Sequence, residues 1–140
     1  MDLENEKCVV VVDENLPVGI IANTAAILGI TIGKTIPGLV GKDVNDLEGN
    51  IHAGIIQLPV PILKGNVEML KEIRGRLYEP SFNDLIVVDF SDLAQRCNYY
   101  DQFTEKMSKC PGTALQYMGI AICGDKKKVN KLTGCLPLLR

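Results

Sequence analysis

The sequence of 140 residues is long enough for one domain with its own core. Hydrophobic residues make up 46% of it and charged residues 23%, which is an ordinary globular composition. Its formal charge of −2 excludes a strong positive field for extended nucleic acid, so any nucleic-acid contact is expected to be local. The segment MDLENEKC lacks a basic region followed by an apolar stretch, which argues against a signal peptide and predicts a cytoplasmic protein.

The first residues predict a strand, a turn and a helix. Cys8 to Val12 form an apolar, largely β-branched run, typical of a strand buried on both faces. Glu14 to Pro17 turn the chain, and Val18 to about Leu28 is apolar all round, which predicts a helix packed between the sheet and neighbouring elements. The stretch from Leu16 to Ile32 is shorter than the roughly 20 clean apolar residues of a membrane span, so we expect no membrane segment.

The middle of the chain predicts a second strand and a second helix. Ile51 to Leu58 has the composition of a strand. Because Pro59 and Pro61 cannot donate hydrogen bonds to a sheet, that strand must end there or lie at an edge. Asn66 is suited to cap a helix that runs through Tyr78, with apolar residues at helical spacing.

Two further strands are expected in the second half. Leu85 to Phe90 predicts a buried strand, after which Ser91 can cap one helical stretch that ends at Pro111. Leu115 to Cys123 predicts the last strand. The second half therefore continues the alternation of strand and helix.

The chain ends in a predicted short helix and an apolar tail. Asp125 can cap the helix Lys126–Thr133, and residues 135–140 are expected to trail behind it. The resulting order β-α-β-α-β-α-β-α predicts one α/β domain over residues 1–140. We expect three layers, α/β/α, around a mostly parallel or mixed four-stranded sheet.

The cysteines indicate neither a disulfide framework nor a zinc site. They are odd in number, widely spaced and lack a C-x-x-C pair, and the single histidine, His52, is the only other soft ligand. We therefore expect mainly buried free thiols, no metal and no cofactor. The five are Cys8, Cys97, Cys110, Cys123 and Cys135.

Three common catalytic or nucleotide motifs are absent. The segment from Gly29 to Thr35 is one residue short of a phosphate-binding P-loop and follows a helix instead of a strand. No G-x-G-x-x-G follows the first strand, since its turn offers only Gly19. No G-x-S-x-G nucleophile elbow is present. These absences argue against nucleotide hydrolysis, hydride transfer and a serine hydrolase.

Four polar residues are candidate ligand contacts, each with a structural alternative. Asp13 ends the first strand, where open α/β sheets place ligands, but its carboxylate can equally cap the turn. Asp89 interrupts a buried strand, where a charge needs a partner or a cleft. Asn23 within an apolar helix needs hydrogen-bond partners, and His52 is either a site residue or a partly exposed strand residue.

Three blocks of sequence together resemble the type II peptidyl-tRNA hydrolases. They are KCVVVVDENLPVG at residues 7–19 before an alanine-containing apolar helix, CPGTALQYMGIAI at 110–122, and VNKLTGCLPLL at 129–139. The sequence is more closely similar to a group of uncharacterised microbial proteins that share that fold. The resemblance implies the hydrolase fold and a ligand such as the end of a tRNA.

The resemblance also implies catalytic residues. The family's proline-glycine-threonine step matches Pro111 to Thr113, and its D-x-G-x-T segment maps loosely onto Asp89 to Ala94. In an ester hydrolase, Asp89 or Asp92 would orient water and Thr113 would supply a hydroxyl or N–H donor.

One departure from the family's pattern affects the expected activity. The family has a lysine in the first turn, but here Leu16 to Gly19 run straight into the helix. Asn23 stands roughly where the family has a glutamine. Losing the cation removes a large part of the stabilisation of a developing oxyanion, so the scaffold need not carry the chemistry.

The leading hypothesis is a protein that binds a small or nucleotide-like ligand without a cofactor. Two alternatives stay open: a divergent peptidyl-tRNA or acyl-ester hydrolase, and a non-catalytic homo-oligomeric module such as a homodimer. The latter is suggested by the apolar segments Pro59–Leu63 and Leu136–Leu139. The candidate ligand contacts are Asp13, Gly19, Asn23 and His52, near Asp89 and Thr113.

Overall fold

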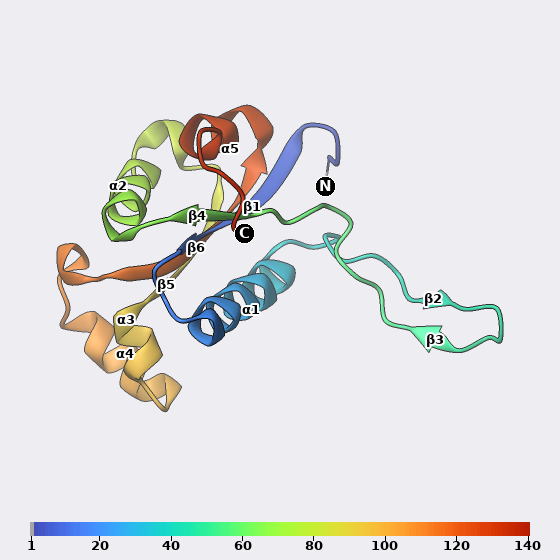
Figure 1. The fold of residues 1–140 in the computed structure, drawn as a ribbon, viewed down its shortest axis with the longest axis horizontal. Coiled ribbons are helices and arrows are strands. Elements are labelled where there is room, and N and C mark those ends of the chain that lie inside the picture. The colour runs from blue at the N-terminus through green and yellow to red at the C-terminus, as the bar shows by residue number, and fades with distance from the viewer. Residues whose placement is uncertain (1) are drawn as a thin grey trace.

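The computed structural model describes residues 2–140, which fold around one four-stranded sheet (Figure 1). The strand order is β4-β1-β6-β5. Strand β1 runs parallel to β4, and β6 runs antiparallel to both of its neighbours. The mixed sheet is therefore confirmed, with antiparallel pairing in two of its three ladders. The strands are β1 (Glu6–Asp13), β4 (Ile62–Gly65), β5 (Ile86–Ser91) and β6 (Tyr117–Asp125).

Five α-helices connect or follow these strands. The predicted caps are confirmed: the backbone N–H groups of Met69 and Lys128 donate to the side chains of Asn66 and Asp125 at 2.9 and 3.0 Å. Ser91 likewise caps the helix after β5. The helices are α1 (Val18–Thr35), α2 (Val67–Leu77), α3 (Asp92–Arg96), α4 (Tyr100–Ser108) and α5 (Lys126–Thr133), with 3-10 turns η1 (Pro80–Phe82) and η2 (Gly112–Ala114).

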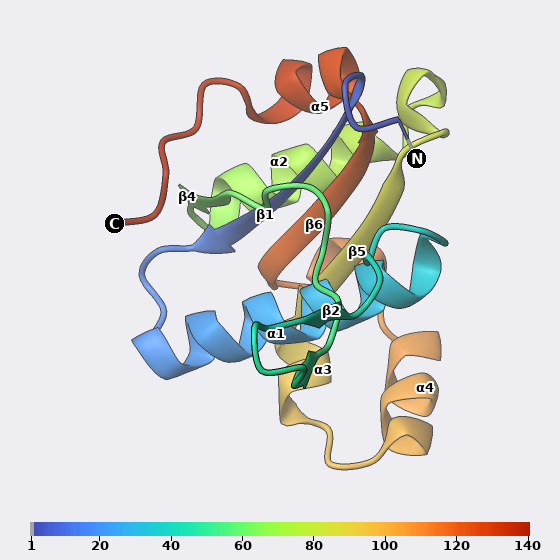
Figure 2. The ribbon, with the colours of Figure 1, turned by 90° about the vertical axis from the view of Figure 1, so that its right-hand side faces the viewer.

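Helices cover both faces of the sheet (Figure 2). Val9 and Val11 of β1 point toward α2 and α5, where they pack in one apolar cluster with Leu70. Val10 and Val12 point to the opposite face and pack with Leu28 of α1 in a second cluster. This alternation follows from the two-residue period of a strand and explains why the whole run is apolar.

The single helix expected after Ser91 is wrong, since the chain forms α3 and α4 separately. Cys97 adopts an extended backbone with φ −88° and ψ 135°, which ends α3. The backbone N–H of Asn98 then donates to the side chain of Gln102 at 3.1 Å, which helps to start the next helix. The Gln102 side chain thus binds the backbone N–H of Asn98, a group that a continuous helix from α3 would use for its own hydrogen bond.

The second predicted strand, Ile51–Leu58, is also wrong. Within that range Ile51–His52 (β3) pairs with Val44–Asn45 (β2), Ile56 forms an isolated bridge with Val40, and the edge strand β4 begins after Pro61. A side chain at Gly54 would collide with the backbone of Gly41, so the chain crosses closely there and forms no continuous ladder. The prolines act as expected, because Pro61 contributes only its carbonyl, to the N–H of Val10 at 3.1 Å.

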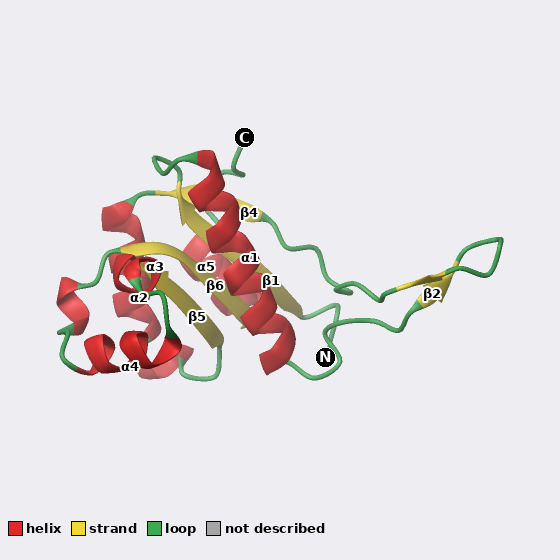
Figure 3. Cartoon of the chain, turned by 90° about the horizontal axis from the view of Figure 1, so that it is seen from below, coloured by secondary structure: helices red, strands yellow, loops and turns green. Residues whose placement is uncertain are grey.

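Residues 40–57, which we call the arm, extend away from the sheet (Figures 1 and 3). Its base is held by the N–H of Gly41 donating to the carbonyl of Ile55 at 2.9 Å. Its tip is a turn in which Asp46 accepts from the backbone N–H groups of Glu48 and Asn50. Apolar side chains on the arm are exposed: Val44 60%, Leu47 98%, Ile51 72% and Ile55 79%.

Helix α1 is longer than the predicted Val18 to about Leu28, and it is covered by the sheet on one side only, in contrast to the predicted helix packed between the sheet and neighbouring elements. Thr24, Leu28 and Ile32 are its buried residues, whereas Ile30 is 75% exposed. The sequence is apolar all round, but only one stripe of the helix reaches the sheet (Figure 3). By length and composition alone, α1 is long and apolar enough to cross a membrane. Of its residues Val18–Thr35, 17% are buried.

Cys8 and Cys123 are joined by a disulfide bond, which corrects the expectation that the cysteines are free thiols. The two residues lie directly opposite each other in the antiparallel pairing of β1 and β6. Sequence spacing could not indicate this pair, because 115 residues separate the two. Cys97, Cys110 and Cys135 are free.

The C-terminal segment folds back instead of trailing from α5. The N–H of Lys64 donates to the carbonyl of Pro137 at 3.0 Å, and the N–H of Leu139 donates to the carbonyl of Ile62 at 2.8 Å. Leu63 is consequently buried. The tail therefore lies along β4, with Leu138 bridging to Leu63, and it covers part of the apolar surface expected from the sequence, although Leu138 itself is 47% exposed.

Candidate functional site

One face of helix α2 carries a cation pair beside an aromatic ring. Lys71, Arg74, Gly75 and Tyr78 follow the i, i+3, i+4, i+7 spacing that places side chains on one side of a helix. The adjacent side of α2 is held to the sheet by buried apolar residues, including Leu70. The sequence of α2 therefore fixes which way this polar face points.

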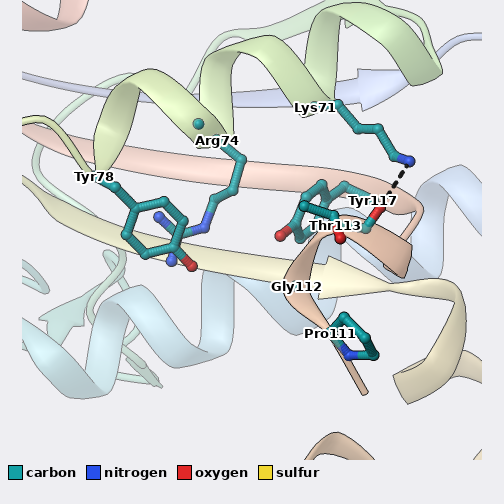
Figure 4. Close-up of a pocket in the computed structure, with 8 residues that line it drawn as sticks. Lys71, Arg74, Tyr78, Pro111, Gly112, Thr113 and Tyr117 are labelled. Atoms are coloured by element: carbon teal, nitrogen blue, oxygen red, sulfur yellow. Dashed lines mark hydrogen bonds between the residues drawn. The ribbon is translucent and has the colours of Figure 1, made fainter.

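The facing wall is the turn η2, between α4 and β6. Pro111 precedes the turn, and the N–H of Ala114 donates to its carbonyl at 2.9 Å. Lys71 joins the two walls, since its Nζ donates to the carbonyl oxygen of Thr113 at 3.2 Å (Figure 4). The turn is anchored from below by the buried Leu115.

A cavity of about 660 Å³, which we call the α2–η2 pocket, lies between these walls (Figure 4). Tyr117 of β6 lies in the pocket wall and is 6% exposed, whereas Tyr78 is 69% exposed. The lining thus combines two cations, two aromatic rings and backbone groups of a glycine-containing turn. The lining residues are Lys71, Arg74, Gly75, Tyr78, Pro111, Gly112, Thr113 and Tyr117.

Arg74 is the central charge of the pocket. Its Nε donates to Oδ2 of Asp89 at 2.9 Å, and its guanidinium carbon lies 4.1 Å from the ring centroid of Tyr78. This stacking and ion pair hold the guanidinium plane in one orientation. Burial raises the pKa of the Tyr117 hydroxyl, and the negative charge of Asp89 adds to the effect. Tyr117 is therefore a neutral hydroxyl at physiological pH.

Of the predicted catalytic residues, only Thr113 lines this pocket. Asp89 is connected to it through the ion pair with Arg74, and itself lines a second cavity of about 380 Å³ together with Phe90 and Phe103. Asp92 instead accepts hydrogen bonds from the backbone N–H groups of Leu93 and Gln116 at 2.9 and 3.1 Å. These bonds tie the start of α3 to the chain before β6.

The predicted ligand contacts Asp13, Gly19, Asn23 and His52 do not line the α2–η2 pocket. Asp13 accepts from the N–H of Asn15 at 3.0 Å, which matches the capping alternative. Gly19 lies in the exposed first turn of α1, and Asn23 lies on the exposed side of that helix.

His52 lies on the arm, where its Nε2 is 2.9 Å from Oδ2 of Asp46. Figure 1 shows the arm well away from α2. Hydrogen bonds from His52 and Asn50 lower the pKa of the Asp46 carboxyl. These contacts stabilise the turn at the tip of the arm. Within residues 2–140, no three His, Cys, Asp or Glu side chains are grouped so that they could hold a metal ion.

Sequence reasoning missed Lys71, Arg74, Tyr78 and Tyr117. Polar residues at helical spacing opposite an apolar stripe are typical of a solvated helix face, so α2 gave no reason to single out its cations. One signal was present in Gly75, since glycine within a helix costs about 1 kcal/mol relative to alanine. Outside its chain neighbours and its own helix backbone, no protein atom lies within 4 Å of where its Cβ would be, so packing against the rest of the chain does not require a glycine.

The fold has a counterpart among solved structures. The structure of Atu0240, a protein of unknown function from Agrobacterium tumefaciens strain C58, superposes with a TM-score of 0.85 over 96% of this chain and 97% of that one. The two sequences are 20% identical, so the likeness shows a common fold alone. A search of curated proteins found no match.

A family comparison covers nearly all of the sequence. Residues 6–140 match the family described as "Protein of unknown function (DUF2000)". The match starts at β1 and runs through the C-terminal segment, so it includes every element of the sheet and the α2–η2 pocket. The expectation of a family of unknown function is confirmed. The chain belongs to the DUF2000 family.

Proposed function

We propose that this protein binds a small or nucleotide-like ligand in the α2–η2 pocket. The observation that carries the proposal is the cavity of about 660 Å³ into which Arg74, Tyr78 and Tyr117 converge from two elements. Ligand sites typically have volumes of about 300–1,000 Å³ and combine apolar walls with a few fixed polar groups. In this proposal the protein is one cytoplasmic domain with a three-layer scaffold of the peptidyl-tRNA hydrolase II type.

Gly75 supports the proposal independently of the charges. A helix-interior glycine lowers helix stability, and here the space beside it opens into the pocket. Because Gly75 has no side chain, a ligand in the pocket can approach the helix backbone at this position. Gly112 on the facing turn has the same property, since a Cβ added there would have no protein atom within 4 Å.

Gly75→Leu tests the pocket, because a leucine there fills the space without opposing helix formation. We expect the variant to be at least as stable as the parent, by up to about 1 kcal/mol. It should also weaken binding of fragment-sized compounds by at least about tenfold, a loss of about 1.4 kcal/mol. The measurement is a titration of a neutral and anionic fragment library, followed by the amide NMR signals of Gly112 and Thr113.

Gly29→Leu is the matched control. Gly29 is also an exposed glycine inside a helix, with no protein atom within 4 Å, but it lies on α1 and outside the pocket. The control should gain similar helix stability and keep fragment binding. Equal binding by both variants, or a library that leaves the Gly112 and Thr113 signals unmoved, would reject the pocket as the binding site.

The ester-hydrolase alternative has less support from the geometry. A water-activating carboxylate needs a free oxygen aimed at the substrate. Neither aspartate lines the α2–η2 pocket: Asp89 is held beside it by the ion pair of its Oδ2 with Arg74, and Oδ1 of Asp92 accepts from two backbone N–H groups elsewhere. Thr113 lies in the pocket, yet a threonine hydroxyl without a base beside it is a weak nucleophile.

A second candidate function is self-association, and the exposed apolar side chains of the arm favour it. A two-stranded hairpin is marginally stable alone in water, and contiguous exposed apolar surface is typical of interfaces. The outer side of α1 is a second uncovered apolar surface, with Ile30 75% exposed. In a twofold dimer the arm of each copy can lie on α1 of the other copy. The contact then occurs twice and buries the arm and the outer side of α1 in both copies.

Sedimentation equilibrium tests this dimer. We expect the parent protein to dimerise and the double variant Leu47→Glu, Ile55→Glu to be monomeric, because each glutamate would be buried against an apolar surface. Leu3→Glu is the control, since Leu3 is 48% exposed and lies outside the arm. A parent protein that is monomeric at high concentration rules the dimer out.

A further inference from the structure

We propose that the ligand of the α2–η2 pocket carries a carboxylate or phosphate group attached to a planar ring. This inference rests on the proposed function of that pocket and specifies its ligand class. The shared chemistry is an oxyanion held by Arg74 and Lys71, with the ring against the tyrosines. An aryl carboxylate and a nucleoside monophosphate both meet this description, and the experiment below separates them.

Arg74 presents an unused pair of terminal nitrogens. Its one hydrogen bond within residues 2–140 is made by Nε to Asp89, so Nη1 and Nη2 have no acceptor in the described part of the protein. The side chain is 16% exposed and is fixed on one side by the Tyr78 ring. A guanidinium held in this way is suited to bidentate hydrogen bonding with a carboxylate or phosphate.

Lys71 adds a second positive charge on the same face of α2, one turn earlier. Its Nζ donates one hydrogen bond, to the carbonyl of Thr113, and it forms no ion pair among residues 2–140. An ammonium group has three N–H donors, so two remain for a ligand or water. The backbone bond keeps this charge at the pocket without neutralising it.

The charge balance of the pocket selects an anion. Lys71 and Arg74 contribute two positive charges, and Asp89 contributes one negative charge through its ion pair. The net charge of these three groups is therefore +1 (two positive minus one negative). A small monoanion or dianion is complementary to this site, whereas a neutral or cationic ligand gains nothing from it.

The aromatic lining selects a planar group. Tyr78 stacks on Arg74 and is 69% exposed, so much of its surface faces solvent at the pocket. Tyr117 contributes a largely buried ring and a neutral hydroxyl in the pocket wall. Rings stack on tyrosine and on arginine planes, which supports a flat ligand next to its oxyanion.

Two matched pairs of probes test the ligand class on the full chain. Benzoate is compared with benzamide, and adenosine 5′-monophosphate with adenosine, by NMR titration of the Gly75, Gly112 and Thr113 amides. We expect the charged member of at least one pair to bind at least about tenfold more tightly than its neutral partner. The pair that shows this difference identifies the source of the oxyanion.

Variants identify the groups that hold the charge. Arg74→Lys keeps the positive charge but removes the paired N–H donors of the guanidinium, so it should weaken binding of the charged probe by at least about tenfold. Lys71→Gln should weaken binding of the same probe by a smaller factor. Lys127→Gln, on the exposed side of α5, is the control and should bind like the parent. Thermal unfolding of each variant checks that the fold is retained.

The outcomes separate this inference from the proposed function. Benzamide or adenosine binding as tightly as the charged probe at the same amides would overturn the oxyanion inference and leave the pocket intact as a binding site. Unchanged affinity in Arg74→Lys would overturn it as well. If neither these probes nor the fragment library move the three amide signals, both the ligand class and the binding function are rejected.

Discussion

Reduction of the Cys8–Cys123 disulfide is expected to lower the free energy of unfolding by roughly 4–5 kcal/mol in the chain-entropy description of cross-links. The bond closes a loop whose ends are 115 residues apart, so breaking it releases much conformational freedom in the unfolded chain. Both cysteines are almost fully buried between β1 and β6. Urea unfolding with and without reductant measures the difference.

The double variant Cys8→Ala, Cys123→Ala controls for other effects of reductant. Its unfolding midpoint should be the same in both buffers, because Cys97, Cys110 and Cys135 are not bonded. A direct count of thiols complements this measurement. The parent protein unfolded without reductant should expose three reactive thiols, and a count of five would contradict the bond.

Leu70→Ala should cost about 2–5 kcal/mol of stability, since it leaves a cavity in the core. Leu70 is 0% exposed and packs on the side of α2 that faces the sheet, in one cluster with Val9 and Val11 of β1. Loosening this contact should also shift Arg74 and Tyr78, which the same helix positions. We therefore expect weaker ligand binding together with the lower unfolding midpoint in urea.

Leu3→Ala is the matched substitution at an exposed site. Leu3 is 48% exposed, so the same truncation should cost less than about 1 kcal/mol there and should leave the pocket unchanged. Equal losses in the two variants would show that burial under α2 does not determine the effect. Binding that survives a destabilised Leu70→Ala would show that the pocket does not depend on how α2 is packed.

Features determined by a few neighbouring residues were predictable from the sequence. The caps Asn66, Ser91 and Asp125 act within one helical turn, and β1, β5 and β6 appear as largely apolar runs, although Asp89 interrupts β5 and that strand lies half-buried at the edge of the sheet. Pro59 and Pro61 showed correctly that no strand continues through them, but β4, which begins after Pro61, was not predicted. The mixed sheet was within the expectation, which came from the alternation of strands and helices.

Features that depend on distant partners were not predictable. The disulfide and the return of residues 137–139 onto β4 require pairings between segments far apart in sequence. The apolar composition of α1 does not reveal that only one side meets the sheet. The candidate site follows the same division: Thr113 came from a short motif, whereas Arg74 becomes distinctive only once Asp89 and Tyr78 lie beside it.

The position of β1 in the centre of the sheet has a consequence for synthesis of the protein. Its register with β6 pairs Glu6 with Asp125, so one side of the central strand stays unpaired until residue 125 has been translated. Pairing over such a separation is slow compared with helix formation. A nascent chain therefore carries the uncharged run Cys8–Val12 without its β6 partner for most of its synthesis, and exposed apolar runs of this kind favour aggregation.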